Sequence, residues 1–265
     1  MSRESRKGKI LKIFLRRFLY SFETLIFPSF CCICGSPLDE FEKLVCKGCL
    51  AKINPMEDNV CLKCGKPLSS PIPNQICLSC IESPPLFTLH RSFSLYDGIL
   101  REIILLMKFR KFKILGKVLA RIAYENLKDF DSLFDCDLII PVPISKKRMA
   151  MRGFNQSEVI AEELSRLTKR SILKNVLIKK IDTIPQSLLS LRERIENVRG
   201  SFEIKNGELL KGKRILLVDD IYTTGSTISE CCKVLLKAGV VEVKVFTIAQ
   251  GGKSIFPLSL EKLDS

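Results

Sequence analysis

Histidine is almost absent from this chain of 265 residues. The only one, His90, lies at the junction between a cysteine-rich segment and a segment with few cysteines. This position favours a structural role for His90. Reactions that need a histidine as the general base therefore have no candidate here, and any base must be a carboxylate or the acceptor itself.

Long uncharged apolar runs are also missing. No stretch reaches the roughly 18 residues that a membrane-spanning helix needs. Residues 10–27 come nearest, but basic residues and a glutamate interrupt them, and no small-residue cleavage site of a secretory signal follows. We therefore expect a cytoplasmic protein. Residues 1–28 are predicted to form an amphipathic helix that packs on the protein or lies on the inner face of the membrane through residues 10–27.

Acidic residues are outnumbered in this sequence. It has 43 Lys and Arg against 29 Asp and Glu, which gives a formal net charge of +14. Such a surplus favours partners that carry phosphate, such as nucleic acid, pyrophosphate or an anionic membrane. A solvated basic surface is the alternative interpretation.

Cysteine, in contrast, is plentiful, and eight of the 12 cysteines form an internal repeat. Residues 31–50 and 61–81 each contain Cys-x-x-Cys-Gly-x-Pro-Leu, a short gap and a second Cys-x-x-Cys. In a reducing compartment, cysteines at this spacing favour metal binding, and two such turns supply the four thiolates of a closed structural zinc site. We therefore predict two structural Zn²⁺ ions. The predicted ligands are Cys31, Cys34, Cys46 and Cys49 for one ion and Cys61, Cys64, Cys77 and Cys80 for the other.

The remaining cysteines are not assigned to metal. Cys32 lacks the two-residue spacing to Cys34, and the other three, Cys136, Cys231 and Cys232, are interpreted as small buried hydrophobic residues. A redox-active dithiol and crossed pairing between the two repeats are the alternatives to the zinc assignment.

Beyond the prolines of residues 82–87, predicted strands alternate with predicted helices. Two helices with Gly116 between them are expected first, and residues 182–202 are expected to form mainly a long loop. Strands are expected over 136–145, 174–181, 213–220 and 241–250, and helices over 157–168 and 226–239. This alternation predicts an α/β fold with a mostly parallel, doubly wound sheet.

The segment Arg214–Thr227, RILLVDDIYTTGST, joins an apolar strand to two acids and a hydroxyl-rich loop. It has neither the Gly-Lys-Ser/Thr of a Walker loop nor the Gly-x-Gly-x-x-Gly of a dinucleotide fingerprint. A receiver domain begins similarly, but it needs a further aspartate well before Asp264, the next one in this chain. We expect Asp219 and Asp220 at the carboxyl end of the strand, where open α/β sheets bind ligands.

The loop that follows these acids is predicted to bind a phosphate. It turns into the next helix, and main-chain N–H groups at a helix N-terminus, aided by hydroxyls, bind phosphate. The loop residues are Thr223, Thr224, Gly225, Ser226 and Thr227. A ribose 5-phosphate fits both halves of the motif, because carboxylates accept hydrogen bonds from its two ring hydroxyls.

The stretch LLVDDIYTTGST resembles the phosphoribosyl-pyrophosphate (PRPP) motif of type I phosphoribosyltransferases. Together with the cysteine repeat, PVPISKKRMAMRGFNQSE and TIPQSLLSLRERIENVRGSF, it makes residues 25–250 similar to the ComF family, which is associated with DNA uptake in natural competence. The resemblance implies a double zinc ribbon over 29–84, a phosphoribosyltransferase-like domain over 88–252 and a tail over 253–265.

The resemblance also implies site residues and a cofactor. The ligand is PRPP or a related phosphoribosyl compound with Mg²⁺, and the catalytic acids are Asp219 and Asp220. Asn155 and Gln156 are expected near the site, although Asn155 also suits a helix N-cap. Seven basic residues are implied for pyrophosphate, with solvent exposure as the alternative for the first three: Lys146, Lys147, Arg148, Arg152, Arg192, Arg194 and Arg199.

Two functions fit these residues. One is transfer of a phosphoribosyl group from PRPP to an acceptor that the sequence does not indicate; carboxylates stabilise the cation-like ribose, and Mg²⁺ and basic residues neutralise the leaving pyrophosphate. The other is an accessory role in DNA uptake, with single-stranded DNA or a competence DNA translocase or helicase as partner. Residues 141–200 contain 13 Lys or Arg and 6 Asp or Glu, a net of +7, but they lack the interleaved aromatics of a stacking platform.

Overall fold

The computed structural model describes residues 30–39, 44–70, 72–130, 132–182 and 191–251. These residues divide between two compact units, residues 1–53 and residues 54–265. The predicted N-terminal helix over 1–28 and the tail over 253–265 lie outside the described residues. No helix among the described residues has both the length and the apolar content needed to cross a membrane.

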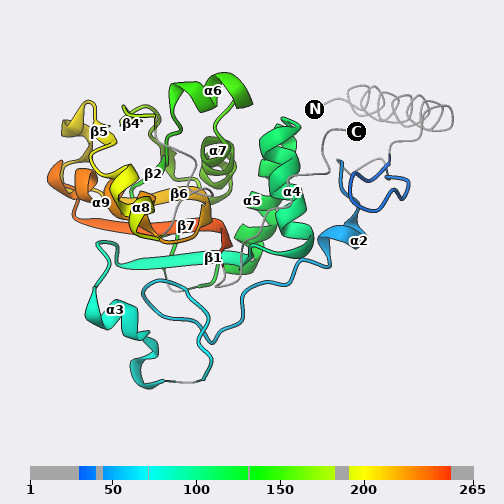
Figure 1. Ribbon diagram of the computed structural model, residues 1–265, viewed down its shortest axis with the longest axis horizontal. Helices are drawn as coiled ribbons and strands as arrows, with labels where there is room; N and C mark the ends of the chain where they lie inside the picture. The colour runs from blue at the N-terminus through cyan, green and yellow to red at the C-terminus, as the bar shows by residue number, and fades with distance from the viewer. Residues whose placement is uncertain (1–29, 40–43, 71, 131, 183–190, 252–265) are drawn as a thin grey trace, which may run out of the picture. The chain divides into compact units, whose positions relative to one another are not determined.

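The larger unit is built on a five-stranded parallel sheet with the order β1-β7-β6-β2-β3 (Figure 1). Its strands are β1 (Leu89–Leu95), β2 (Leu138–Pro141), β3 (Ser171–Ile172), β6 (Arg214–Tyr222) and β7 (Glu242–Gln250). The central strands are buried on both faces, which explains why β6 begins as a continuous apolar run. The predicted α/β fold with a parallel sheet is confirmed.

Three helices pack together on one side of this sheet (Figure 1). They are α4 (Gly98–Phe109), α5 (Lys113–Leu127) and α7 (Gln156–Thr168). The prediction that Gly116 separates two helices is wrong, because the break lies at residues 110–112 and Gly116 lies inside α5. A Cβ at Gly116 would approach Val159 of α7 to 3.0 Å and Met107 of α4 to 3.1 Å, so this glycine lets the three helices pack closely.

The other face of the sheet carries α9 (Ser226–Lys237) and the second cysteine repeat. Ile215 and Leu217 are two residues apart in β6, so their side chains point to the same face of the sheet. Both belong to a buried cluster that includes the four cysteines of the second repeat. The repeat contains η1 (Pro73–Gln75) and α3 (Leu78–Glu82). The division into compact units therefore falls inside the segment 29–84, because the second repeat packs on the sheet.

A small hairpin with a helix precedes β6. Its strands, β4 (Leu177–Lys179) and β5 (Phe202–Ile204), are antiparallel, and α8 (Leu191–Val198) lies between them in sequence, followed by η3 (Gly207–Leu210). The long loop predicted over 182–202 is wrong for α8. Its charged residues obscure a short apolar repeat that ends at the buried Val198, and α8 packs on α9.

The two cysteine repeats have the same local fold. In the smaller unit, the N–H of Cys31 donates to the carbonyl of Ser36 at 2.8 Å, and in the larger unit Cys61 donates to Lys66 at 2.8 Å. The first Cys-x-x-Cys turn of each repeat then ends at a glycine with positive φ, Gly35 in one and Gly65 in the other. The second cysteine pair of the first repeat leads into α2 (Lys47–Leu50), which corresponds to α3 in the second.

Candidate functional site

Strand β6 continues through the two acids. It loses its partner β2 after Val218, which pairs with Pro141, but it stays paired with β7 as far as Tyr222. The expectation that the strand stops at the acids therefore needs correction. The continued pairing holds Asp219 and Asp220 in a regular strand at the carboxyl edge of the sheet, where the ends of the neighbouring strands also meet.

Asp219 is held by two hydrogen bonds to one of its carboxylate oxygens. The hydroxyl of Ser157, in the first turn of α7, donates to Oδ1 at 2.7 Å, and the main-chain N–H of Asp220 donates to it at 2.9 Å. Burial raises the pKa of Asp219 to about 7, and the charge of Asp220 acts in the same direction, against these hydrogen bonds. Asp219 therefore changes charge near neutral pH.

Asp220 forms an ion pair with Lys108 of α4. The Nζ–Oδ2 distance is 2.7 Å, and the two side chains are only 14% and 13% exposed. Burial alone would raise the pKa of Asp220, but the charges of Lys108 and Arg152 outweigh it and lower the pKa. The two adjacent acids are thus driven apart in pKa by their different neighbours.

Lys108 is a site residue that the sequence reasoning missed. A signal for it is present, because Lys108 follows Leu100 and Ile104 at intervals of four residues, on the apolar stripe that buries α4. A lysine on such a stripe needs a buried partner. In this fold the partner is Asp220, which comes from a strand more than a hundred residues later.

Arg152 and Gln156 bring unpaired donors close to the acids. Nη1 of Arg152 donates to Oε1 of Gln156 at 3.0 Å, whereas Nε of Arg152 and Nε2 of Gln156 are buried and have no hydrogen-bond partner among the described residues. Burial lowers the pKa of Arg152, and the charges of Asp219 and Asp220 partly restore it. Buried donors without acceptors are costly, so they indicate a polar group that binds there.

The predicted basic loop is in fact a short helix, α6 (Lys146–Arg152). Ser145 caps it by accepting from the N–H of Arg148 at 3.3 Å, which is why the residues after β2 wind into a helix. Lys146 and Lys147 are exposed, as the alternative interpretation expected. Arg148 is half-buried, and its positive charge repels that of Lys179 in β4. Burial is the main cause that lowers the pKa of Lys179 to about 8, and the repulsion by Arg148 is the second.

The other polar residues predicted near the site are not gathered in one place. Asn155 caps α7: it accepts from the N–H of Ser157 at 3.1 Å and donates to the carbonyl of Val142 at 2.9 Å. It therefore serves as the helix N-cap that the sequence allowed. Arg199 is exposed and its charge acts on Glu230 of α9. The side chains of Arg192 and Arg194 in α8 lie outside the described residues.

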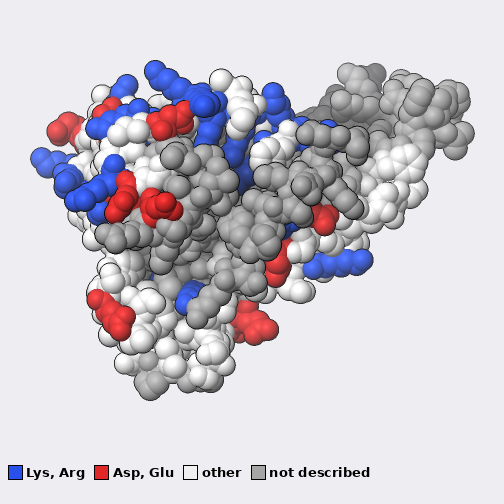
Figure 2. Space-filling view, in the orientation of Figure 1, with Lys and Arg blue, Asp and Glu red and all other residues white. Residues whose placement is uncertain are grey.

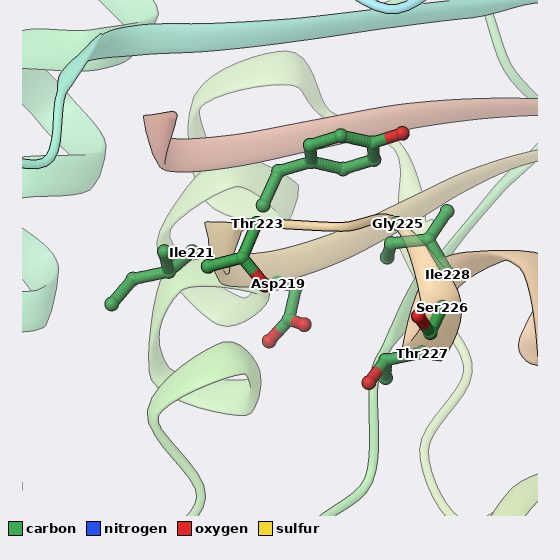
Figure 3. Close-up of a pocket in the computed structure, with 8 residues that line it drawn as sticks. Asp219, Ile221, Thr223, Gly225, Ser226, Thr227 and Ile228 are labelled. Atoms are coloured by element: carbon green, nitrogen blue, oxygen red, sulfur yellow. The ribbon is translucent and has the colours of Figure 1, made fainter. Parts of the chain in front are cut away.

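The hydroxyl-rich loop borders an open pocket together with Asp219 (Figure 3). Gly225 has a φ of +76° directly before α9, and the hydroxyls of Thr224 and Ser226 are hydrogen bonded at 2.7 Å. The first N–H groups of a helix attract anions. The pocket is lined by Asp219, Ile221, Tyr222, Thr223, Gly225, Ser226, Thr227 and Ile228.

The cysteines form two groups of four, Cys31, Cys34, Cys46 and Cys49 in one unit and Cys61, Cys64, Cys77 and Cys80 in the other. Within each group all sulfur atoms lie within 4.8 Å of one another, and individual pairs are 3.6 Å, 3.7 Å and 3.9 Å apart. Thiolates at about 2.3 Å from a tetrahedral zinc lie roughly 3.8 Å from each other, so both groups fit structural Zn²⁺. The remaining cysteines, Cys32 apart, are buried in the larger unit.

Comparisons with known proteins support both halves of this description. Residues 22–81 match the double zinc ribbon domain, and residues 156–259 match the phosphoribosyl transferase domain. The chain is 31% identical over 229 residues to "Competence protein F" of Haemophilus influenzae, which covers 84% of this chain and 98% of the relative. The chain belongs to the ComF family.

Another relative agrees with membership of the ComF family. "DNA utilization protein YhgH" of Shigella flexneri is 28% identical over 230 residues, covering 85% of this ComF-family chain and 99% of the relative. Among solved structures, the purine phosphoribosyltransferase of Pyrococcus horikoshii covers 56% of this chain and 93% of its own, with 15% identity and a TM-score of 0.31.

Proposed function

We propose that this ComF-family protein binds PRPP, or a related phosphoribosyl pyrophosphate, together with Mg²⁺ at the carboxyl edge of its sheet. The observation that carries the proposal is the pocket in which Asp219 faces the hydroxyl-rich loop at the start of α9 (Figure 3). A ligand that joins vicinal hydroxyls to a phosphate satisfies both sides of this pocket. The carboxylates accept from the hydroxyls, and the loop donates to the 5-phosphate.

The same proposal gives the other site residues their tasks. The unpaired donors of Arg152 and Gln156 bind the pyrophosphate, since they are buried beside the acids. Carboxylates and phosphate oxygens are ligands that Mg²⁺ prefers, so the carboxylate of Asp220, which pairs with Lys108, would hold the ion together with the pyrophosphate oxygens. Lys108 then stays within reach of the negative pyrophosphate.

Calorimetric titration with PRPP and Mg²⁺ tests this proposal. Asp219→Asn/Asp220→Asn is expected to weaken PRPP binding by about a hundredfold or more, because both acids lose their charge and hydrogen bonds to charged groups contribute about 1.5–3 kcal/mol each. Asp137→Asn is the matched control, because Asp137 pairs with Arg214 at the opposite end of β6. No binding of PRPP by the unaltered protein, or equal losses in both variants, contradicts the proposal.

Transfer of the phosphoribosyl group is the stronger form of this function. The bond from ribose C1 to pyrophosphate breaks and its electrons leave with pyrophosphate. A lone pair of the acceptor forms the new bond to C1, and the acceptor's proton passes to a carboxylate or to water. The carboxylates stabilise the positive charge on the ribose between these events. Release of pyrophosphate from PRPP, measured with nucleobases, amines and nucleic acid as acceptors, checks it. Pyrophosphate release that depends on Asp219 and Asp220 supports an enzyme, and PRPP binding without pyrophosphate release in the presence of any acceptor limits the function to binding.

A role in DNA uptake in the cytoplasm is the second part of the proposal. It is supported by the names of the relatives and by the basic side chains that gather over α6 (Figure 2). Lys146→Glu/Lys147→Glu is expected to weaken single-stranded DNA binding and to flatten its salt dependence, since each lost phosphate contact removes about 0.7 from the log–log slope. Lys211→Glu/Lys213→Glu, an equal charge change at exposed positions before β6, is the control. If the affinity for single-stranded DNA does not depend on salt concentration, the proposed contacts between these lysines and DNA phosphates are excluded.

A further inference from the structure

The second cysteine group lies inside the hydrophobic core of the larger unit. Its four cysteines are buried, and the same cluster contains Phe87, Cys231 and Cys232. Cys231 and Cys232 belong to α9, whose first residues form part of the hydroxyl-rich loop, residues 223–227, called the phosphate loop from here on. A zinc ion in this group therefore stabilises the same core on which the loop and its helix rest.

His90 joins the first turn of this cysteine group to the sheet. Its main-chain N–H donates to the carbonyl of Lys63 at 2.8 Å, and its Nδ1 lies 2.7 Å from the carbonyl of Cys64. A carbonyl only accepts, so Nδ1 carries the proton and Nε2 accepts from the hydroxyl of Thr247, 3.0 Å away. His90 is fully buried, and a Cβ on Gly65 would lie 2.8 Å from its carbonyl oxygen, so turn and strand are in direct contact.

Tyr222 lies on the flat face of the same imidazole. The two rings are stacked with centroids 4.2 Å apart and an angle of 25°, and Phe87 meets the tyrosine edge-on at 6.3 Å. The phosphate loop also contacts Tyr222. A Cβ on Gly225 would lie 2.8 Å from Cζ of Tyr222, so the loop backbone rests directly on the tyrosine ring.

We propose that the zinc ion of the second cysteine group fixes the phosphate loop through His90 and Tyr222, which act as positioning residues. The metal holds the turn at residues 61–65, the turn holds the imidazole, the imidazole supports Tyr222, and the tyrosine ring supports Gly225. Loss of this zinc loosens the loop, and loss of the zinc in the first group does not. The inference rests on the proposed function only where the loop binds the 5-phosphate of PRPP.

The test compares equivalent double variants of the two repeats. Cys77→Ser/Cys80→Ser and Cys46→Ser/Cys49→Ser each remove the second cysteine pair of one repeat, and each is expected to lower the zinc content from two ions to one. Amide hydrogen exchange over residues 222–228, measured without ligand, is expected to become about tenfold faster in the first variant only. PRPP affinity, measured with Mg²⁺, is expected to fall about tenfold in the same variant.

Two further variants leave every cysteine in place. His90→Gln retains a donor for the carbonyl of Cys64 but removes the ring that Tyr222 stacks on, and Tyr222→Leu removes the support below Gly225. Both are expected to keep two zinc ions and to show faster exchange only over residues 222–228. Tyr222→Phe keeps the stack and is expected to restore slow exchange.

Each outcome decides a separate question. Unchanged exchange over residues 222–228 in Cys77→Ser/Cys80→Ser, or an equal change in Cys46→Ser/Cys49→Ser, overturns the inference. If Cys77→Ser/Cys80→Ser unfolds the larger unit, His90→Gln and Tyr222→Leu decide, and slow loop exchange in both overturns it. If the unaltered protein does not bind PRPP, the proposed function fails, while the exchange data still test the coupling of zinc to the loop.

Discussion

The two cysteine repeats have the same sequence pattern and the same local hydrogen bonds, but their surroundings differ. In the first, Cys34 is exposed and Cys46 is half-buried, whereas in the second all four cysteines are buried. The second repeat is also held by Arg91 of β1, which donates to the carbonyl of Leu62 at 3.0 Å. One metal-binding motif can therefore close a small module in one place and form part of a domain core in another.

The largest contrast is expected from alanine at the two equivalent glycines. Both Gly35 and Gly65 have positive φ, so alanine costs each about 1 kcal/mol of backbone strain. At Gly65 the new Cβ also lies 2.8 Å from the carbonyl oxygen of His90, whereas at Gly35 no described atom lies within 4 Å. Gly65→Ala is expected to destabilise the larger unit by about 3 kcal/mol in total.

Thermal unfolding of the larger unit, followed through its helices, measures this contrast. Gly35→Ala should leave that transition within about 0.5 kcal/mol of the unaltered protein. Equal destabilisation by the two substitutions would show that the surroundings of the repeats do not matter.

A smaller contrast is expected in the rates at which the two zinc ions leave. A chelator reaches the first group, which includes the exposed Cys34, through local opening, whereas the second group opens only when the core does. We expect two phases of one zinc ion each, with rates that differ by about tenfold or more. Cys46→Ser/Cys49→Ser should abolish the fast phase and Cys77→Ser/Cys80→Ser the slow one, as followed by a colorimetric zinc indicator. A single phase for both ions is incompatible with the comparison.

The last effect concerns pH, and it belongs to the larger unit alone through Asp219. Unfolded Asp219 loses its proton near pH 4, whereas in the folded unit burial raises its pKa to about 7. Between these values the folded state binds one more proton than the unfolded state, so stability falls as pH rises through this window. In melting curves at several pH values, Asp219→Asn should remove this part of the slope. If stability changes with pH equally in the unaltered protein and in Asp219→Asn, the pKa of Asp219 is not raised by burial.

The sequence predicted the features of this site that depend on local spacing. The cysteine sets follow from Cys-x-x-Cys turns, and the acids and hydroxyls of residues 219–227 are neighbours in the chain. It did not predict Lys108 or Lys179, because their roles depend on partners brought together only by tertiary packing. It also placed Gly116 between helices, since a glycine needed for close helix packing looks the same in sequence as one that ends a helix.

The surroundings of the second repeat were beyond sequence reasoning for a similar reason. Its contacts with His90 and Arg91 use main-chain carbonyls, which every residue has and no residue type reveals. The helix over 191–198 was missed because its stabilising contact is with α9, which comes later in the chain.

The pairing of β1 with β7 also separates the two repeats in time during synthesis. Cys31 and Cys49 are separated by 18 positions in the sequence, so the first repeat can fold around its metal almost as soon as it leaves the ribosome. His90 meets Thr247 only after 157 further residues, which take roughly 8 to 30 s at the usual rates of translation. During that interval the second set of thiols has no shell of core residues, and competing metals and oxidants can reach it.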